Sequence, residues 1–167
     1  MLNKELRPEL ISRRGEMNAW LFAFVISVAL GMLYWSMGKI PNVAWVFLGF
    51  FLFAAFSTSF GNWMDRGTVM SLDDSGIAFE NGIRQVALSW DEIKKVNIIP
   101  ARWGKNIQVI GEASHFEFRT LGEVQYQGEV KGHLGFVKGE AVLKEILKKT
   151  NLHLEKEEKG SYYYSRV

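Results

Sequence analysis

Two long uncharged runs near the start of the chain constrain its fold more than any other feature. Across residues 17–64 the only charged side chain is Lys39, which separates a run from Met17 to Gly38 from a second run from Ile40 to Met64. As a helix, the first run rises roughly 33 Å at ~1.5 Å per residue, against a hydrocarbon core of about 30 Å. The glycine, proline and asparagine around Lys39 favour a tight reversal. The sequence therefore predicts a transmembrane helical hairpin.

Two other structures produce apolar runs, and the sequence favours neither. Buried helices of a soluble core usually keep a polar stripe and are shorter, and a signal peptide has a shorter apolar region with no second span behind it. Aromatic side chains gather near the ends of both runs, as expected of interfacial belts in a bilayer. These belt residues are Trp20 and Trp63 at one level and Tyr34, Trp35 and Trp45 at the other.

The distribution of basic residues predicts the orientation of the hairpin in a cell's inner (plasma) membrane. The leading segment, residues 1–16, carries four lysines and arginines, the connector carries only Lys39, and further arginines follow the second run. By the positive-inside rule, both termini are expected on the cytoplasmic side. Within this juxtamembrane segment Leu2, Leu6 and Leu10 recur every four residues. The segment is therefore expected to be either a short amphipathic helix on the inner leaflet or a frayed tail.

Small side chains mark one face of the first run, where Ala23, Ser27 and Gly31 follow one another at four-residue spacing. Such a face allows another helix to approach closely. The neighbouring span is the simplest partner, and a helix of another subunit is the alternative. Neither run contains an ionisable residue, which argues against a proton relay or a transport site within this chain.

From Asp65 onward the composition becomes that of a water-soluble domain. This region carries as many lysines and arginines as aspartates and glutamates, and the whole chain contains no cysteine. Charge balance argues against general binding of nucleic acid, which needs a basic excess to neutralise phosphates. The absence of cysteine excludes disulfides and thiolate chemistry. Residues 65–152 are of a length that forms one domain.

Short alternating runs separated by turn residues predict a meander of antiparallel strands. After Gly139 apolar residues recur at helical spacing up to Thr150, which predicts one amphipathic helix that covers the sheet. Thr120 to Lys138 is expected to be a loop or an extra hairpin around Val124 to Val130, and residues 153–167 a charged, tyrosine-rich tail. The six expected strands are Thr68 to Leu72, Gly76 to Glu80, Arg84 to Trp90, Ile93 to Ile99, Ile107 to Ile110 and His115 to Arg119.

An α+β layout of this kind, with a meander followed by a closing helix, resembles bacterial pleckstrin-homology-like (PH-like) membrane proteins. The resemblance is carried by the turn at Asp74 to Ile77, the step from Leu88 to Ile93 and the closing helix. It implies an antiparallel sheet or barrel closed by a C-terminal helix, with no catalytic motif. The layout is also similar to that of photosystem I assembly proteins, which combine a two-span hairpin with a small β-rich domain.

Motifs for chemistry are sparse. The histidines His115, His133 and His153 lack the spacing of metal ligands, and the glycine-rich stretch from Gly132 to Gly139 lacks the ending of a phosphate-binding loop. We therefore expect no catalytic residues, no metal and no cofactor.

One constellation is typical of a membrane surface. Arg102 and Lys105 flank Trp103 in an expected loop, and basic residues are attracted to anionic headgroups while tryptophan prefers the interface. The alternative is a plain hairpin in which Trp103 folds back onto the sheet.

The sequence thus predicts a membrane-anchored, non-enzymatic interaction or assembly module at the inner leaflet. Its expected partners are the bilayer and another protein or a second copy of the chain, and not nucleic acid. Two alternatives stay open: a sensor of lipid headgroups, and an accessory subunit or assembly factor of a larger membrane complex.

Overall fold

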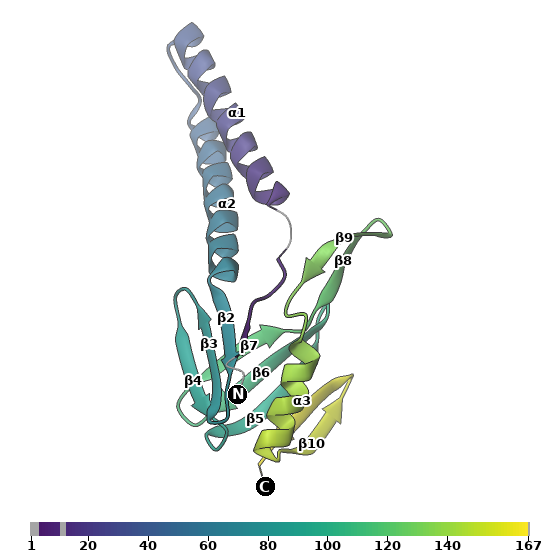
Figure 1. Ribbon diagram of the computed structural model, residues 1–167. Coiled ribbons are helices and arrows are strands. Elements are labelled where there is room, and N and C mark those ends of the chain that lie inside the picture. Colours follow the sequence, from purple (N-terminus) through teal and green to yellow (C-terminus); the bar gives the residue numbers. More distant parts are fainter. Residues whose placement is uncertain (1–3, 11–12, 167) are drawn as a thin grey trace. The chain divides into compact units, whose positions relative to one another are not determined.

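The computed structural model describes residues 4–10 and 13–166, which fall into two compact units (Figure 1). Ser12–Met64 form a helical unit, whereas Met1–Ile11 and Asp65–Val167 together form a β-rich unit. The helical unit is therefore inserted, in sequence, between the first strand of the β-rich unit and the rest of it.

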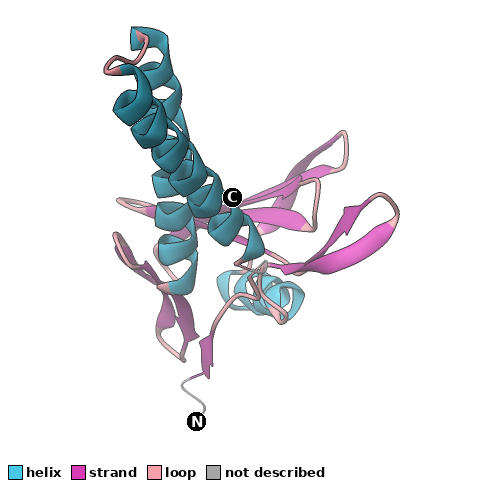
Figure 2. Cartoon of the chain, turned by 90° about the horizontal axis from the view of Figure 1, so that it is seen from above, coloured by secondary structure: helices cyan, strands magenta, loops and turns pink. Residues whose placement is uncertain are grey.

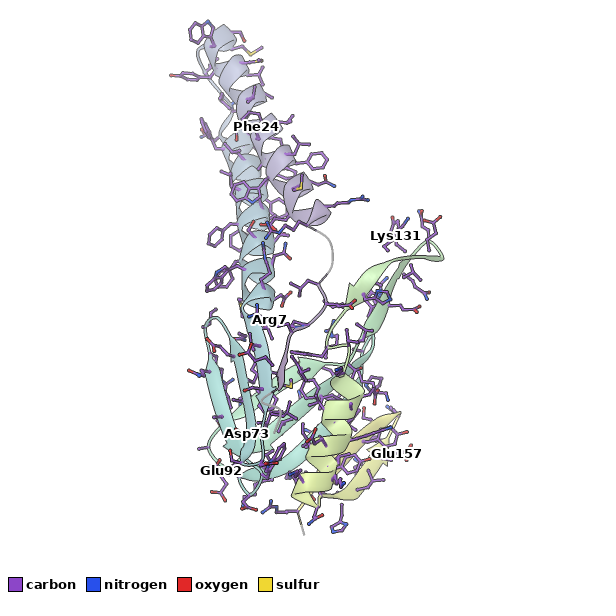
Figure 3. All side chains as sticks on the ribbon, in the orientation of Figure 1. Arg7, Phe24, Asp73, Glu92, Lys131 and Glu157 are labelled. Atoms are coloured by element: carbon purple, nitrogen blue, oxygen red, sulfur yellow. The ribbon has the colours of Figure 1, made fainter. Side chains whose placement is uncertain are left out.

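The helical unit contains two helices, α1 (Arg14–Met37) and α2 (Asn42–Arg66). The reversal follows from Gly38, whose backbone has φ 69° and whose N–H donates a 2.8 Å hydrogen bond to the carbonyl of Tyr34. Only glycine adopts such a left-handed conformation at little cost. Both helices are long and apolar enough to cross a membrane. Most of their large apolar side chains, Phe24 among them, stand out from the ribbon and are exposed (Figure 3).

The two helices enclose one small residue each, Ala23 in α1 and Ala55 in α2. Side-chain hydrogen bonds join Glu16 to Asn62 and Trp20 to Ser59 across the pair. This antiparallel register puts Ala23 opposite Ala55. Small side chains let helix backbones approach closely at that level.

The β-rich unit contains two antiparallel sheets and a separate hairpin (Figure 1). The first sheet has the order β1-β2-β3-β4 and the second the order β10-β11-β5-β6-β7. The hairpin pairs β8 with β9 and extends away from the sheets (Figure 2). The strands are β1 (Lys4–Leu6), β2 (Thr68–Leu72), β3 (Gly76–Asn81), β4 (Gln85–Ser89), β5 (Ile93–Pro100), β6 (Lys105–Gly111), β7 (His115–Arg119), β8 (Gly122–Tyr126), β9 (Glu129–Leu134), β10 (His153–Glu158) and β11 (Ser161–Ser165).

The helix α3 (Gly139–Thr150) contributes its apolar side, Val142, Leu143 and Ile146, to one core shared with both sheets. Strands β2, β4 and β7 supply side chains to this core in alternation, so that every second residue is buried. In β3 and β5 the alternation is interrupted. The largest fully enclosed side chains are Met70, Ile77, Ile93, Ile107, Ile146, Val96 and Val109.

The α+β class and the long apolar helices followed by antiparallel strands are confirmed. The strands form two open sheets, and no barrel closes within residues 4–10 and 13–166. The stretch 120–138 contains the hairpin that was one of its two expected forms.

Two expectations about the chain ends were wrong. Where it is described, the leading segment is neither an amphipathic helix nor a frayed tail: Leu2 lies outside the described residues, and Leu6 belongs to β1, which pairs with β2. The expected tail from residue 153 forms β10 and β11, and β11 pairs with β5 at residues 162–165. In both cases an open strand edge in the sheet supplies hydrogen-bond partners that a local sequence pattern does not reveal.

Candidate functional site

The loop expected to contact lipid lies between β5 and β6. The guanidinium carbon of Arg102 lies 5.0 Å from the centroid of the Trp103 ring, which is half-buried. Lys105 does not point its charge freely outward, because its Nζ lies 2.9 Å from Oε1 of Glu140 at the start of α3. Both cations are exposed, but Lys105 is paired with a carboxylate, whereas Arg102 is stacked on an aromatic ring. A lipid role for Arg102, Trp103 and Lys105 stays a prediction.

Backbone contacts fix the position of this loop. A Cβ added at Gly104, which has φ +77°, would lie 2.5 Å from the carbonyl oxygen of Thr120. On the other side, a Cβ at Gly122 would lie 2.4 Å from the backbone nitrogen of Gly104. Both distances are far below those that real Cβ atoms show, so both positions need glycine. The loop is thus held tightly against the start of β8.

The small residues on one face of α1 differ in their burial. Ala23 is enclosed, whereas Gly31 is exposed and a Cβ added there would meet no described atom within 4 Å. The reason is geometric: steps of four residues advance each position by about 40° around a helix with 3.6 residues per turn. By Gly31 the face has turned away from α2. There Val28, Gly31, Met32 and Trp35 line a shallow apolar groove.

The five belt residues are all at the ends of the helices and are exposed. Trp20 lies near the start of α1 and Trp63 near the end of α2, while Tyr34, Trp35 and Trp45 lie on either side of the reversal. Trp20 differs from the others because its indole N–H donates a 2.7 Å hydrogen bond to the hydroxyl of Ser59. It thus combines an exposed ring with a role in joining the helices.

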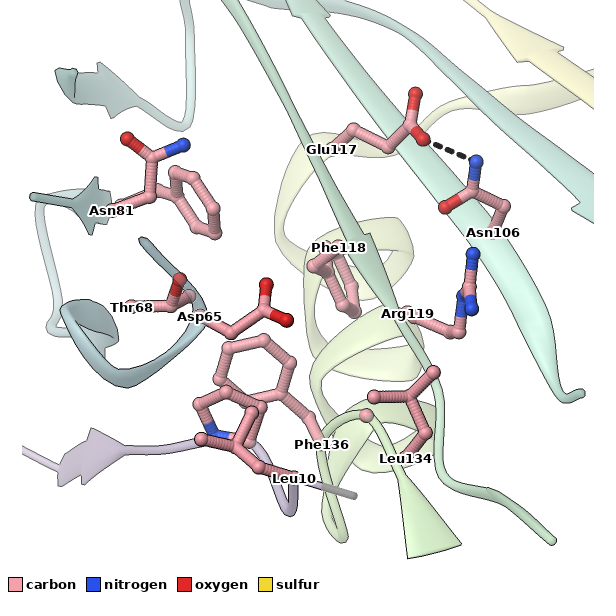
Figure 4. A pocket seen from close by; sticks show the side chains of 13 residues that line it. Leu10, Asp65, Thr68, Asn81, Asn106, Glu117, Phe118, Arg119, Leu134 and Phe136 are labelled. Atoms are coloured by element: carbon pink, nitrogen blue, oxygen red, sulfur yellow. Dashed lines mark hydrogen bonds between the residues drawn. The ribbon is translucent and has the colours of Figure 1, made fainter. Parts of the chain in front are cut away.

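A pocket of about 350 Å³ lies within the β-rich unit (Figure 4). Such a volume is at the lower end of the range of small-molecule sites, about 300–1,000 Å³. Its wall is mixed: aromatic side chains contribute an apolar floor, and six polar residues surround it. The lining residues are Pro8, Leu10, Asp65, Thr68, Phe79, Asn81, Asn106, Glu117, Phe118, Arg119, Leu134, Gly135 and Phe136.

The floor of this pocket is part of the core. Phe118 and Phe136 are both 3% exposed, and their rings meet edge to face with centroids 6.0 Å apart. Phe79 is stacked at 5.2 Å on the neighbouring core residue Phe116. Because these rings pack in the core and Phe79 is also only 7% exposed, the floor offers the pocket little open aromatic surface.

The charged residues of the pocket differ in how far they are already engaged. Glu117 accepts hydrogen bonds from the side-chain amides of Asn106 and Gln108. Asp65 and Arg119 attract each other electrostatically, yet neither side chain makes a hydrogen bond or an ion pair within 4.0 Å to another described residue. Figure 4 shows the Asp65 carboxylate facing the pocket from one side and Arg119 lying across from it. The pocket thus offers one acceptor group and one donor group that remain available.

A second set of acidic side chains stabilises turns. The Asp73 carboxylate accepts hydrogen bonds from the hydroxyl and N–H of Ser75 and from the N–H of Gly76, and these bonds lower the pKa of Asp73. The N–H and hydroxyl of Ser89 likewise lower the pKa of Glu92. Both carboxylates lie at the same end of the β-rich unit (Figure 3). Their geometry closes turns and needs no ligand.

The histidines are placed singly. His133 lies 3.6 Å from the carboxylate of Glu9, while His115 and His153 are exposed strand residues. In the described part of the chain, no three histidine, aspartate or glutamate side chains are grouped so that they would hold a metal ion.

Sequence motifs do not reveal this pocket, because its polar residues come from distant parts of the chain. Asp65 follows the second uncharged run directly, Asn81 ends β3, and Arg119 ends β7. One feature of the sequence does point to the pocket: Asp65 and Arg119 each lie at the end of a helix or strand. A comparison with known protein families, with curated proteins and with solved structures finds no match for this chain.

Proposed function

We propose that this protein is a membrane-anchored, non-enzymatic interaction or assembly module. In this proposal α1 and α2 cross the inner (plasma) membrane as a hairpin, and both termini and the β-rich unit are cytoplasmic. The exposed apolar surface of both helices supports the anchoring, because such surface is stable only in lipid or against another protein. The excess of basic residues before α1, compared with the single Lys39 in the connector, supports the orientation.

The open groove at Gly31 is the observation that carries the interaction role. A glycine whose surroundings are empty, flanked by Val28, Met32 and Trp35, offers a recess for the side chains of another membrane helix. The hairpin's own second helix does not use it. We therefore propose that a helix of a partner protein, or of a second copy of this chain, packs there.

The PH-like character of the β-rich unit is part of the proposal. The order of the strands from β2 to β7, followed by α3, supports it. The open sheets and the additional strands β10 and β11 depart from a barrel closed by its last helix.

Two alternatives have a specific observation in their favour. A lipid-headgroup sensor is favoured by Arg102, which is exposed beside Trp103. An accessory subunit or assembly factor of a larger complex is favoured by the groove at Gly31, which would then hold a helix of that complex.

The lack of cysteine makes the topology directly testable. Single cysteines are introduced as Lys39→Cys in the connector and Lys159→Cys in the turn between β10 and β11. A membrane-impermeant maleimide applied to intact cells should label the first variant and not the second, and should label both after lysis. Labelling of Lys159→Cys in intact cells would overturn the orientation, and recovery of the protein in the soluble fraction would overturn the anchoring.

The partner is tested by site-specific photo-crosslinking in membranes. A photoreactive phenylalanine analogue replaces Trp35, which lines the groove, or Leu33, which lies on another side of α1. A discrete adduct at position 35, absent at position 33, is expected. No adduct at either position would contradict a partner in the groove.

A further inference from the structure

The pocket of the β-rich unit lies where the chain passes to and from the two helices. Leu10 is followed after only a few residues by α1, and Asp65 directly follows Met64, the last residue of the second uncharged run. Both residues line the pocket. A residue spans at most about 3.6 Å of chain. If the helices cross a membrane, as proposed above, the pocket is therefore held within a short distance of the lipid headgroups.

The charges in the pocket select against simple ions. An anion alone would face two carboxylates, Asp65 and Glu117, and a cation alone would face the guanidinium of Arg119. A ligand that carries both charges satisfies both groups, because like charges repel and opposite charges attract strongly where water is partly excluded. Arg119 is suited to a phosphate, which it can bind through two parallel hydrogen bonds.

The positive end of the ligand is further defined by the available acceptors. Asp65 accepts no hydrogen bond from any described residue, so its carboxylate can receive N–H donors. Asn106 also lines the pocket and can add an acceptor oxygen, whereas the side-chain oxygen of Asn81 already accepts a hydrogen bond from the N–H of Arg84. A primary ammonium donates three hydrogen bonds to such a set. A quaternary ammonium donates none and is usually held by open aromatic faces, which the packed rings on the pocket floor do not provide.

From these observations we infer that the pocket binds a phosphoethanolamine group, with the phosphate at Arg119 and the ammonium at Asp65. Its source is the headgroup of a membrane phospholipid, since the pocket adjoins both connections to the helices. The apolar floor and Leu10 then contact the glycerol end of the lipid. This inference rests on the proposed membrane anchoring and assigns the lipid contact to a site other than Arg102, Trp103 and Lys105.

The test uses the full-length protein purified in a mild detergent. Native mass spectrometry measures the retention of added phosphatidylethanolamine, phosphatidylcholine and phosphatidylglycerol. Wild-type protein is expected to retain phosphatidylethanolamine about tenfold better than the other two lipids. Asp65→Asn and Arg119→Gln should each reduce the retention of phosphatidylethanolamine about tenfold, which is the usual effect of losing one charge-assisted hydrogen bond. Asp91→Asn and Arg84→Gln, which change exposed charges outside the pocket, serve as matched controls and should retain the preference.

Several outcomes would overturn the inference. Equal retention of the three lipids, or an unchanged preference in the folded Asp65→Asn variant, would exclude the site. Asp65 is exposed, so this variant carries the test if Arg119→Gln fails to fold. Soluble glycerophosphoethanolamine that binds as tightly as the lipid would overturn the membrane source. Because binding is measured in detergent, it is independent of the cysteine labelling above, and the two proposals can fail separately.

Discussion

The indole N–H of Trp20 donates a 2.7 Å hydrogen bond to the hydroxyl of Ser59 and so links the two apolar helices. Ser59 in turn donates to one carboxylate oxygen of Glu16 at 2.9 Å, and the amide of Asn62 donates to the other at 2.9 Å. These four polar side chains pair with one another at the end of the hairpin opposite the reversal. Where little water is available, such pairing fixes the register of two otherwise featureless apolar helices.

Replacing Ser59 with alanine is expected to weaken the hairpin. The change removes an acceptor for Trp20 and a donor for Glu16, which costs about 1–3 kcal/mol of the free energy of helix association. Thr58→Ala is the matched control, because among the described residues the Thr58 hydroxyl bonds only to the carbonyl of Ala54 in its own helix. Titration of the protein from mild detergent into dodecyl sulfate, followed by circular dichroism, measures both. Equal effects of the two changes would contradict the linking role of Ser59.

The two small residues Ala55 and Gly31 should respond oppositely to enlargement. Ala55 is fully enclosed, so Ala55→Leu must separate the helices and is expected to cost about 1–3 kcal/mol. Gly31→Leu has open space and should leave hairpin stability within about 0.5 kcal/mol. The same dodecyl sulfate titration measures both changes. Gly31→Leu should also abolish the photo-crosslink from position 35, and a retained adduct would argue against a partner in the groove.

Gly135 is expected to be irreplaceable in the β-rich unit. It has φ +107°, and a Cβ there would lie 2.5 Å from the carbonyl oxygen of Thr120. Gly135→Ala should therefore destabilise the unit by about 1–3 kcal/mol through backbone strain. Gly132→Ala, in the neighbouring strand β9, meets nothing within 4 Å and should behave like wild type. Thermal unfolding followed by near-ultraviolet circular dichroism distinguishes the two variants.

Acidification should destabilise the β-rich unit through Asp73 and Glu92. Hydrogen bonds from Ser75 and Gly76, and from Ser89, lower the pKa of these carboxyls in the folded chain. A group whose pKa is lower when folded stabilises the fold above its unfolded pKa, and this stability is lost as the pH falls through the folded pKa. The loss is expected below about pH 4, where unfolded Asp and Glu begin to protonate.

A comparison of variants at two pH values checks this dependence. Asp73→Asn cannot titrate, so its unfolding temperature should fall less than that of wild type between neutral pH and the acid range. Asp91 is an exposed aspartate whose carboxylate pairs with Arg166 and closes no turn. The unfolding temperature of Asp91→Asn should therefore fall with pH as that of wild type does. If the unfolding temperature of Asp73→Asn fell with pH as much as that of wild type, the turn at Asp73 would not be the cause of the acid sensitivity.

Sequence pattern was sufficient where the local period determines the structure. The bounds of β2, β7 and α3 agree with the expectation to the residue, because alternation and helical spacing are strong in these segments. It was insufficient for β1 and β11. Lys4–Leu6 is too short for a periodic signal, and its pairing partners are residues 70–72, which lie beyond both helices in sequence.

The contacts of the candidate site were harder to predict from the sequence than the strands and helices, because most of them join distant parts of the chain. The sequence placed Arg102 beside Trp103 in a loop, and the stack of one on the other joins these neighbouring residues. The approach of Lys105 to Glu140, and of Asp65 to Arg119, joins residues far apart in the chain. No motif spacing encodes such pairs, since they depend on how the strands and α3 are arranged in three dimensions.

Removal of the last strands should expose a sheet edge. A chain that ends at Leu152 lacks β11, which pairs with β5 and places Tyr162 and Tyr164 against the core. An unpaired central strand promotes association between molecules, so this variant should elute as large oligomers in size-exclusion chromatography. Lys156→Ser, which removes an ion pair with Glu158 on the outer strand β10, is the control and should elute like wild type.

The pairing of β1 with β2 also determines when the β-rich unit can form. During synthesis Lys4–Leu6 emerge first, but their partners in Thr68–Leu72 emerge only after both apolar helices have been made. The first strand must therefore remain unpaired until both helices have been synthesised. A chain that ends before residue 68 would lack the strand with which β1 pairs. The first sheet can therefore be completed only after both helices have been synthesised.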